Sequence, residues 1–199
     1  MTRAESFPAL LAEIRACRLC AAHLQDGPRP VFQASLSSRL LIVSQAPGRK
    51  VHVTGIPFND VSGDRLRAWL GIDRATFYDA QRIAIIPMGF CFPGSGRQGD
   101  LPPRPECAPT WHPRLLPRLK HVQLTLAIGQ YAQAGILGDR RGASLTETMQ
   151  NWREYLAEGI LPLPHPSPRN QLWLKRNPWF EVELLPELRS EVAQVLGRD

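Results

Sequence analysis

Short runs of hydrophobic residues alternate along the chain with longer stretches in which hydrophobic positions recur at helical spacing. The short runs predict buried strands over residues 40–43, 83–86, 124–128 and 160–163. The longer stretches predict helices over residues 7–16, 62–71, 112–120, 129–137, 145–157 and 178–196. Buried strands connected by helices are typical of a parallel sheet with both faces covered. The pattern therefore predicts an α/β fold, a three-layer αβα sandwich with a central, mostly parallel four-stranded sheet.

Residues that start and stop helices refine these boundaries. Ser62 is a candidate N-cap of the second predicted helix, and Gly71 is a candidate stop signal for it. Pro113 falls in the first turn of the third predicted helix, where a proline is tolerated. Residues 92–109 form a loop rich in Pro and Gly that is too long for an ordinary connection. A metal site would explain how this loop is held in place.

The chain length of 199 residues suits one sizeable hydrophobic core and is short for two domains. Because no internal repeat or low-complexity tract interrupts it, we expect a single domain over residues 1–199. No hydrophobic run approaches the roughly 18 residues of a membrane span, and residues 1–6 lack the hydrophobic core of a signal peptide. We therefore expect a cytoplasmic protein with no membrane contact, acting as a monomer.

The charge of the chain is positive and comes mainly from arginine. The net charge is +6, and of the 24 basic residues only Lys50, Lys120 and Lys175 are lysines. Arginine suits bidentate contact with phosphate, so this excess favours a nucleic acid partner. A GC-rich genome also raises the arginine content, and charge alone therefore gives only modest support.

The four cysteines predict a metal site. Cys17 and Cys20 form a C-x-x-C pair, and Cys91 and Cys107 lie far downstream. In a cytoplasmic protein an even number of cysteines argues less for disulfides than for metal ligation. The pair can place two thiolates on one metal or cluster, and two distant thiolates can complete a four-sulfur site. Four independent buried thiols are the alternative, which suits Cys107 better than the pair.

Residues 165–170, H-P-S-P-R-N, follow the last predicted strand and carry several reactive groups. The prolines fix their own φ angles and hold His165 and Ser167 in extended conformations. The segment should therefore present an imidazole, a hydroxyl, a guanidinium and an amide from stiff backbone. Open α/β sheets bind ligands at the carboxyl ends of their strands, which is where this segment falls. A solvated surface turn rich in proline is the alternative.

Two further motifs accompany this segment and the cysteines in a fixed order. Residues 44–48 read S-Q-A-P-G directly after the first predicted strand, and residues 55–58 read G-I-P-F. The ordered set resembles the uracil-DNA glycosylase superfamily, and it is most similar to the iron–sulfur enzymes of families 4 and 5. Their motifs are G-E-A-P-G or G-L-A-P-G, G-x-P-F, four cysteines, and H-P-S or H-P-A. The resemblance covers about residues 8–196.

The resemblance implies a DNA-repair enzyme. Such enzymes flip uracil or another deaminated base out of DNA and hydrolyse its N-glycosidic bond. No lysine nucleophile stands in the motifs, so the expected product is an abasic site from a monofunctional enzyme. The implied cofactor is a structural 4Fe–4S cluster on Cys17, Cys20, Cys91 and Cys107, with zinc as the alternative. The implied partner is DNA that contains a deaminated base, which places the protein at the nucleoid of a bacterial-type cell.

The resemblance also assigns roles to individual residues. His165 would stabilise the anion that leaves as the glycosidic bond breaks, and Gln45 would orient the attacking water. The base would stack on Phe58, with Ser44 and Ala46 beside it. Contacts to the DNA backbone or groove would come from the rest of the last motif, namely Ser167, Arg169 and Asn170.

Two departures from the family pattern put full activity in question. Gln45 and Ala46 occupy the positions where relatives carry a water-positioning acid, and a glutamine cannot accept a proton as a carboxylate can. Cleavage would then rely on stabilisation of the leaving group, or would recruit Asp60 or Asp64 as the acid, although a helix cap is the more ordinary role for Asp60. Pro87 stands where the iron–sulfur enzymes place an asparagine that reads the pyrimidine edge, which leaves hypoxanthine and xanthine open as substrates.

Two other functions compete with the repair enzyme. The first is an iron–sulfur protein that binds nucleic acid on the glycosylase scaffold with weak or no catalytic activity. The second is an unrelated α/β hydrolase with Ser167 as nucleophile, which is disfavoured because the chain lacks the G-x-S-x-G turn of that class.

Overall fold

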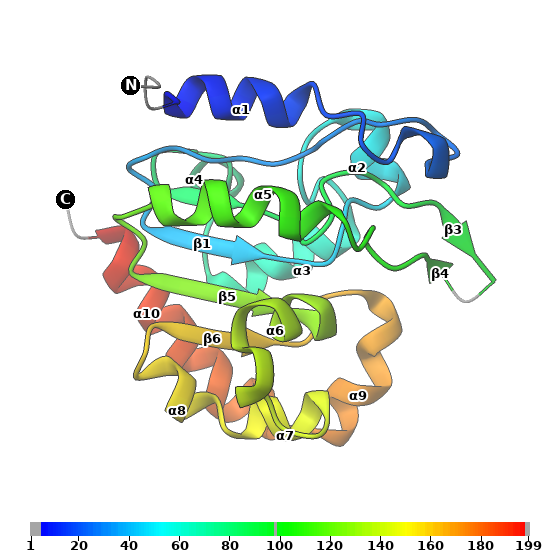
Figure 1. Cartoon of the computed structure of the whole chain (residues 1–199). Coiled ribbons are helices and arrows are strands. Elements are labelled where there is room, and N and C mark those ends of the chain that lie inside the picture. Colours follow the sequence, from blue (N-terminus) through cyan, green and yellow to red (C-terminus); the bar gives the residue numbers. More distant parts are fainter. Residues whose placement is uncertain (1–4, 98, 198–199) are drawn as a thin grey trace.

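The computed structural model describes residues 5–97 and 99–197 of the chain. At its centre lies a sheet in the order β2-β1-β5-β6 (Figure 1), formed by β1 (Leu40–Val43), β2 (Ile83–Ile85), β5 (Leu124–Ile128) and β6 (Ile160–Leu163). Each pair of neighbouring strands runs parallel. Leu40 of β1 lies beside Ile83 on one side and Leu124 on the other. The predicted strands and the predicted sheet are therefore confirmed.

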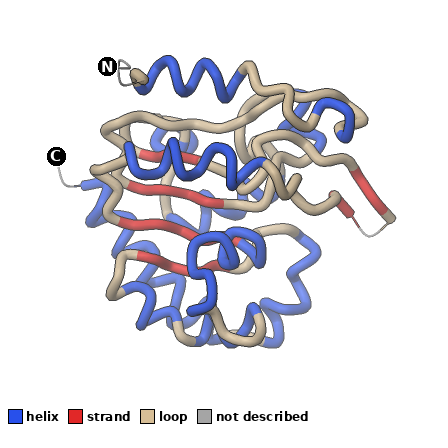
Figure 2. The backbone as a smooth tube through the Cα atoms, in the orientation of Figure 1, coloured by secondary structure: helices blue, strands red, loops and turns tan. Residues whose placement is uncertain are grey.

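Helices cover both faces of the sheet, as Figure 2 shows. Successive side chains of a strand point to opposite faces, so Leu40 and Ile42 pack on one side and Leu41 and Val43 on the other. The first side is covered by α3 (Val61–Leu70), α4 (Arg74–Phe77), α8 (Trp152–Leu156), α9 (Gln171–Arg176) and α10 (Leu185–Gly197). The second side is covered by α1 (Phe7–Arg15), α5 (Cys107–Leu115) and α6 (Gly129–Leu137). The three-layer αβα prediction is confirmed.

Several helix boundaries differ from the prediction. The N-cap of α3 is Asp60 rather than Ser62, because the Asp60 carboxylate accepts the backbone N–H of Gly63 at 2.9 Å. Gly71 ends α3 in a left-handed conformation, as predicted. Helix α5 begins at Cys107, so Pro109 rather than Pro113 lies in its first turn.

Two of the long predicted helices are divided. The helix predicted over residues 145–157 consists of α7 (Leu145–Gln150) and α8, which meet at Asn151. The closing helix begins with a π-helical turn, Phe180–Leu184, before α10. Pro186 follows this turn and has no N–H to continue the ordinary ladder, which accounts for the wider turn before it. Short elements that the pattern did not predict are α2 (Arg49–Thr54), α4 and α9.

The predicted loop over residues 92–109 contains structure of its own. Strand β3 (Ser95–Gly96) pairs antiparallel with β4 (Gly99–Asp100), and the hairpin projects beyond the sheet in Figure 1. The sequence predicted one continuous loop over residues 92–109, whereas the structure forms two short strands within it and begins α5 at Cys107. Two-residue strands carry too little alternation to be recognised from the sequence.

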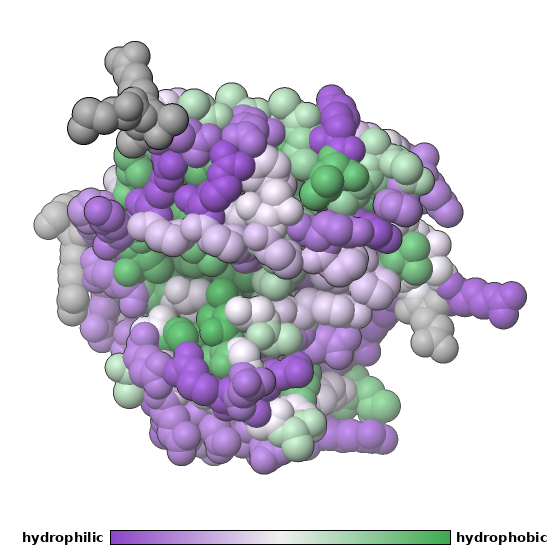
Figure 3. Space-filling view, viewed as in Figure 1, coloured by the Kyte–Doolittle hydropathy of each residue, from purple (hydrophilic) through white to green (hydrophobic). Residues whose placement is uncertain are grey.

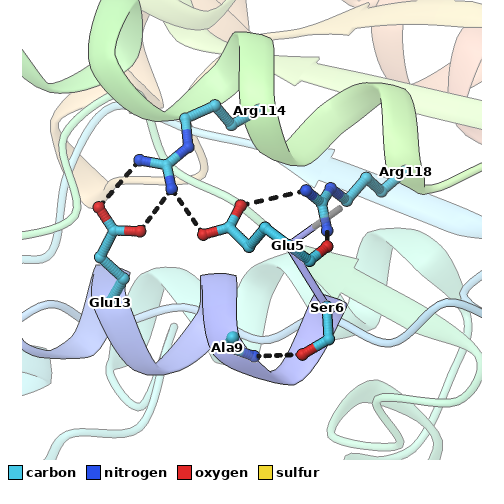
Figure 4. A network of polar contacts seen from close by, with 6 residues as sticks. All are labelled: Glu5, Ser6, Ala9, Glu13, Arg114 and Arg118. Carbon is cyan, nitrogen blue, oxygen red and sulfur yellow. Dashed lines mark hydrogen bonds and ion pairs between the residues drawn. The ribbon is translucent and has the colours of Figure 1, made fainter. Parts of the chain in front are cut away.

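An ion-pair network fastens α1 to α5 (Figure 4). Arg114 donates to Glu13 at 3.0 Å and to Glu5 at 2.7 Å, and Arg118 donates to the other carboxylate oxygen of Glu5 at 3.1 Å. The hydrogen bond from Arg114 lowers the pKa of Glu13. Ser6 caps α1 by accepting the N–H of Ala9. Since Cys17 follows α1 by two residues and α5 begins at Cys107, the network connects two helices that lie next to cysteines of the predicted metal site.

The outer surface is mixed in character. Figure 3 shows hydrophilic residues over much of the face drawn there, with hydrophobic residues visible in patches near α5 and α6. Within the described ranges, none of the helices is both long enough and apolar enough to cross a membrane.

Candidate active site

The loops at the carboxyl ends of the parallel strands enclose a cavity of about 390 Å³. Its volume lies within the range of small-molecule sites in proteins, which is roughly 300–1,000 Å³. The lining includes every non-cysteine residue that the sequence assigned to the site, namely Ser44, Gln45, Ala46, Phe58, His165, Ser167, Arg169 and Asn170. The structure thus brings together side chains that lie more than a hundred positions apart in the chain. Their chemical roles remain predictions.

His165 is held in one tautomer by its own loop. Its Nδ1 accepts the backbone N–H of Ser167 at 3.2 Å, so in the neutral ring the proton resides on Nε2. Burial lowers the pKa of His165, although the carboxylates of Asp60 and Asp100 act in the opposite direction. The ring is therefore a neutral hydrogen-bond donor near pH 7. Gly129, with a φ of 78°, packs against the ring, where an added Cβ would lie 3.6 Å from the Cβ of His165.

The rest of the H-P-S-P-R-N segment is fixed by polar contacts that the sequence did not predict. The Asn170 side chain donates to the carbonyl oxygen of His165 at 2.7 Å. From α3, Arg65 donates to the carbonyl oxygen of Ser167 at 3.3 Å. The buried amide of Gln133 in α6 donates to the carbonyl oxygen of Leu163 at 3.0 Å, at the end of β6. These contacts hold the segment in addition to its prolines. Arg65 and Gln133 belong to none of the sequence motifs, so the sequence did not identify them as residues that support the site.

Phe58 belongs both to the cavity wall and to the hydrophobic core. Its ring lies edge-on to Phe77, with 6.1 Å between the ring centroids, and its side chain is buried. It has a φ of 53°, which is a strained conformation for a bulky residue. The first turn of α3 packs against it so closely that a Cβ on Gly63 would lie 1.7 Å from the Phe58 carbonyl oxygen. The fold therefore forces this ring into its place at the cavity.

The S-Q-A-P-G segment follows β1 and is hydrogen-bonded to the backbone of the segment that follows β2. The N–H of Met88 donates to the carbonyl oxygen of Ser44 at 2.8 Å, and the N–H of Gly89 donates to that of Gln45 at 2.9 Å. The Gln45 side chain donates from Nε2 to the carbonyl oxygen of Leu101 at 3.4 Å. Leu101 follows the β3–β4 hairpin, so Gln45 connects the first motif to the hairpin at the cavity.

The hairpin contributes Asp100 to the cavity, a residue that no sequence motif marks. Its Oδ1 accepts the hydroxyl of Ser95 at 3.1 Å. Its Oδ2 lies 3.3 Å from the position that a Cβ on Gly48 would take. Because Asp100 stands in a long segment without recognisable pattern, no sequence signal places it at the cavity.

The other acids and Pro87 occupy different positions. Asp60 lines the cavity but also caps α3, which is the ordinary role expected for it. Asp64 pairs with Arg67 and is not among the cavity residues. Pro87 lines the cavity, and its carbonyl oxygen lies 3.0 Å from Nε2 of His112. Burial lowers the pKa of His112, so the neutral imidazole donates a hydrogen bond from its Nε2–H to the carbonyl oxygen of Pro87.

A smaller pocket is lined by the four cysteines, Cys17, Cys20, Cys91 and Cys107. None of these four described cysteines forms a disulfide. Burial raises the pKa of Cys91 to about 11 and that of Cys107 to about 12. In the described part of the chain, no group of three or more His, Cys, Asp or Glu side chains stands ready to hold a metal ion. The pocket thus has the donor set of a four-cysteine site, while the thiols are not arranged around a single ion.

An αβα sandwich with a polar cavity at the carboxyl ends of a parallel sheet defines a ligand-binding α/β protein. The sequence model of the uracil DNA glycosylase superfamily matches residues 31–189, which is most of the chain. The chain belongs to this superfamily. Membership implies in general a hydrolase of the DNA glycosylase type, with DNA as partner. The match begins after Cys17 and Cys20, so the iron–sulfur branch stays a prediction.

Proposed function

We propose that this protein is a monofunctional DNA glycosylase that removes uracil, or another deaminated base, from DNA and leaves an abasic site. The observation that carries the proposal is the shared cavity, because His165, Phe58 and Gln45 all line it. These residues come from three motifs that are distant in sequence. A flipped nucleobase needs a concave site with a stacking surface and polar groups at its edge.

His165 is the group that stabilises the leaving base. When the N-glycosidic bond breaks, its electron pair remains on the base and negative charge develops on the base oxygen. A hydrogen bond from Nε2 of His165 strengthens as this charge appears, and a donor fixed beforehand stabilises the transition state more than the ground state. The hydrogen bond that Nδ1 accepts from Ser167 keeps the ring in the tautomer that this role requires.

Phe58 supplies the surface on which the flipped base stacks. Its backbone strain and its contact with Phe77 fix the ring before the base arrives. Ser44 and Ala46 lie along the same cavity and contact the base from the first motif. Pro87 replaces the amide reader of the iron–sulfur relatives, so discrimination between uracil, hypoxanthine and xanthine rests on other cavity groups.

The last motif also binds DNA. Ser167 and Arg169 line the cavity. Ser167 contacts a backbone phosphate, and Arg169 contacts either phosphate or the groove next to the flipped base. Asn170 uses its amide N–H to hold His165, which leaves its carbonyl oxygen for DNA. A net charge of +6 supports attraction to the polyanion, and binding should weaken with salt.

The cysteine pocket holds a 4Fe–4S cluster in this proposal, with zinc as the alternative. Cys17, Cys20, Cys91 and Cys107 would be the ligands, and the support is that they line one pocket. The group would supply no chemistry to hydrolysis. It would tie the segment after α1 to the start of α5, next to the hairpin that reaches the cavity. The protein would act as a single-domain monomer in the cytoplasm, at the nucleoid.

A second candidate is a nucleic-acid-binding protein with little or no catalytic activity. Gln45 in place of an acid and Pro87 in place of an asparagine favour it. The two are separated by incubating the protein with oligonucleotides that contain uracil, hypoxanthine or xanthine, in single and double strands, followed by alkali. Strand breaks at the modified base support the glycosylase. Tight, salt-sensitive binding without strand breaks supports the binding protein.

A further inference from the structure

Hydrolysis in this cavity needs a group that takes a proton from water, and the first motif does not supply one. Gln45 cannot accept a proton as a base, and Ala46 has no polar side chain. Nδ1 of His165 already accepts the N–H of Ser167, and its Nε2 carries the ring proton. Asp60 accepts the N–H of Gly63 as the cap of α3. One further carboxylate lines the cavity, that of Asp100.

Asp100 lies next to the first motif at the cavity. Its Oδ2 lies 3.3 Å from the position of a Cβ on Gly48, the last residue of S-Q-A-P-G. The other oxygen, Oδ1, accepts the Ser95 hydroxyl, which fixes the carboxylate within the hairpin. The carboxylate also lies near enough to His165 to raise the pKa of the imidazole, in opposition to the effect of burial. An acid is thus present beside the motif that lacks its own.

The hairpin that carries Asp100 is tied to both motif loops. The N–H of Leu101 donates to the carbonyl oxygen of Gly94 at 2.9 Å, which closes the hairpin at its base. Gln45 donates to the carbonyl oxygen of Leu101 at 3.4 Å. On the other side, Arg169 lies so close to Gly99 that an added Cβ would be 1.6 Å from its Nη1. The hairpin that carries Asp100 therefore contacts both the first and the last motif.

We infer that Asp100 is a further catalytic residue, the general base that activates the attacking water, and that Gln45 is a positioning residue that anchors the Asp100 hairpin. This inference rests on the proposed glycosylase function. In the step, the water oxygen forms a bond to C1′ of the deoxyribose while the C1′–N bond breaks. The electron pair of that bond leaves with the base, whose oxygen is hydrogen-bonded to His165. The proton of the water passes to the carboxylate of Asp100.

The test compares Asp100→Asn, Asp60→Asn and Asp139→Asn in single-turnover excision from a uracil-containing oligonucleotide. Asp139 is exposed, lies outside the cavity and serves as the matched control. Asp100→Asn should lower the rate roughly 10²–10⁴-fold, the usual contribution of a general base. Its affinity for the same oligonucleotide should stay within a few-fold of wild type, and Asp139→Asn should behave as wild type.

Chemical rescue separates a catalytic role from a structural one. Asp100→Ala leaves space for a small carboxylate, so added formate should restore part of the lost rate, whereas it should leave Gln45→Ala unaffected. Wild-type excision by Asp100→Asn overturns the inference, as does a loss in Asp100→Ala that formate does not restore. Loss of excision in Asp60→Asn, with Asp100→Asn active, also overturns the inference and assigns the role of general base to Asp60. If wild-type protein releases no base from any substrate, the glycosylase function itself is overturned.

Discussion

Nδ1 of His165 accepts a hydrogen bond from the backbone N–H of Ser167, two residues further along the same loop. This contact places the ring proton on Nε2 and holds the imidazole neutral, in line with the burial that lowers its pKa. The prolines at 166 and 168 restrict the loop, so the contact is present before any ligand binds. A short sequence motif thus determines both the position and the protonation of the central side chain.

The pH dependence of excision should reflect this neutral imidazole. Because the pKa of His165 is lowered, the ring stays neutral as the pH falls through about 6.5, the ordinary value for histidine. The single-turnover rate should therefore hold constant from pH 8 to below that value, and protonation at lower pH should reduce it. The rate profile and the NMR titration of the ring nitrogens measure this directly. A rate that rises on protonation of His165 would contradict the neutral-donor role.

Gly63→Ala tests the packing that positions Phe58. The new Cβ would lie 1.7 Å from the Phe58 carbonyl oxygen, so Phe58 or α3 must move. Overpacking of this kind destabilises by about 1–3 kcal/mol or more. We expect a lower free energy of unfolding in denaturant titrations and a lower excision rate. Gly197→Ala is the control, since an added Cβ there meets no atom within 4 Å. Equal stability of the two variants would show that Phe58 is not fixed by α3.

Arg169→Ala should weaken binding to duplex DNA more than excision from a short single-stranded substrate. A guanidinium that contacts phosphate or enters the groove contributes to holding the duplex open, and a single strand needs no opening. Fluorescence anisotropy across a salt series gives the slope of log binding constant against log salt concentration, and this slope should fall by about one phosphate contact. Arg153→Ala is the matched control, because Arg153 pairs with Glu183 and is not a cavity residue. Equal losses on both substrates would argue against a role in opening the duplex.

Removal of one cysteine should destroy the metal site. Protein purified without oxygen should contain iron and sulfide in equal amounts and absorb broadly in the visible range, whereas zinc would leave it colourless. Cys107→Ser should lose the bound metal and melt at a lower temperature, because the N-terminal segment and the start of α5 are no longer tied together. Metal analysis and thermal unfolding of both proteins provide the measurements. Retention of full metal content by Cys107→Ser would remove this residue from the ligand set.

The sequence predicted the central sheet well because its strands are continuous hydrophobic runs. Leu40–Val43 and Leu124–Ile128 are buried on both faces, so local composition alone identifies them. Helix α5 was predicted to begin five positions late because Pro113 looked like a first-turn proline, while Pro109 takes that place. The break at Asn151 lies within an otherwise helical pattern, so periodicity does not register it.

The cavity was predictable only where motifs mark it. His165, Phe58 and Gln45 follow recognisable strand ends or turns, and all three line the cavity. Asp100 lies in a two-residue strand of a hairpin that contacts Gln45 and Arg169, and such long-range contacts leave no local signal. The same is true of Arg65, which holds the Ser167 loop from α3.

The most direct test of the glycosylase function is single-turnover excision of uracil from an oligonucleotide by wild-type protein, His165→Ala and His165→Gln, scored by alkali cleavage. Loss of one preorganised donor typically lowers the rate about 10²–10³-fold. We predict abasic sites with wild type, a loss of this size with His165→Ala at unchanged thermal stability, and partial activity with His165→Gln, whose amide can donate. Equal rates for wild type and His165→Ala would contradict the account.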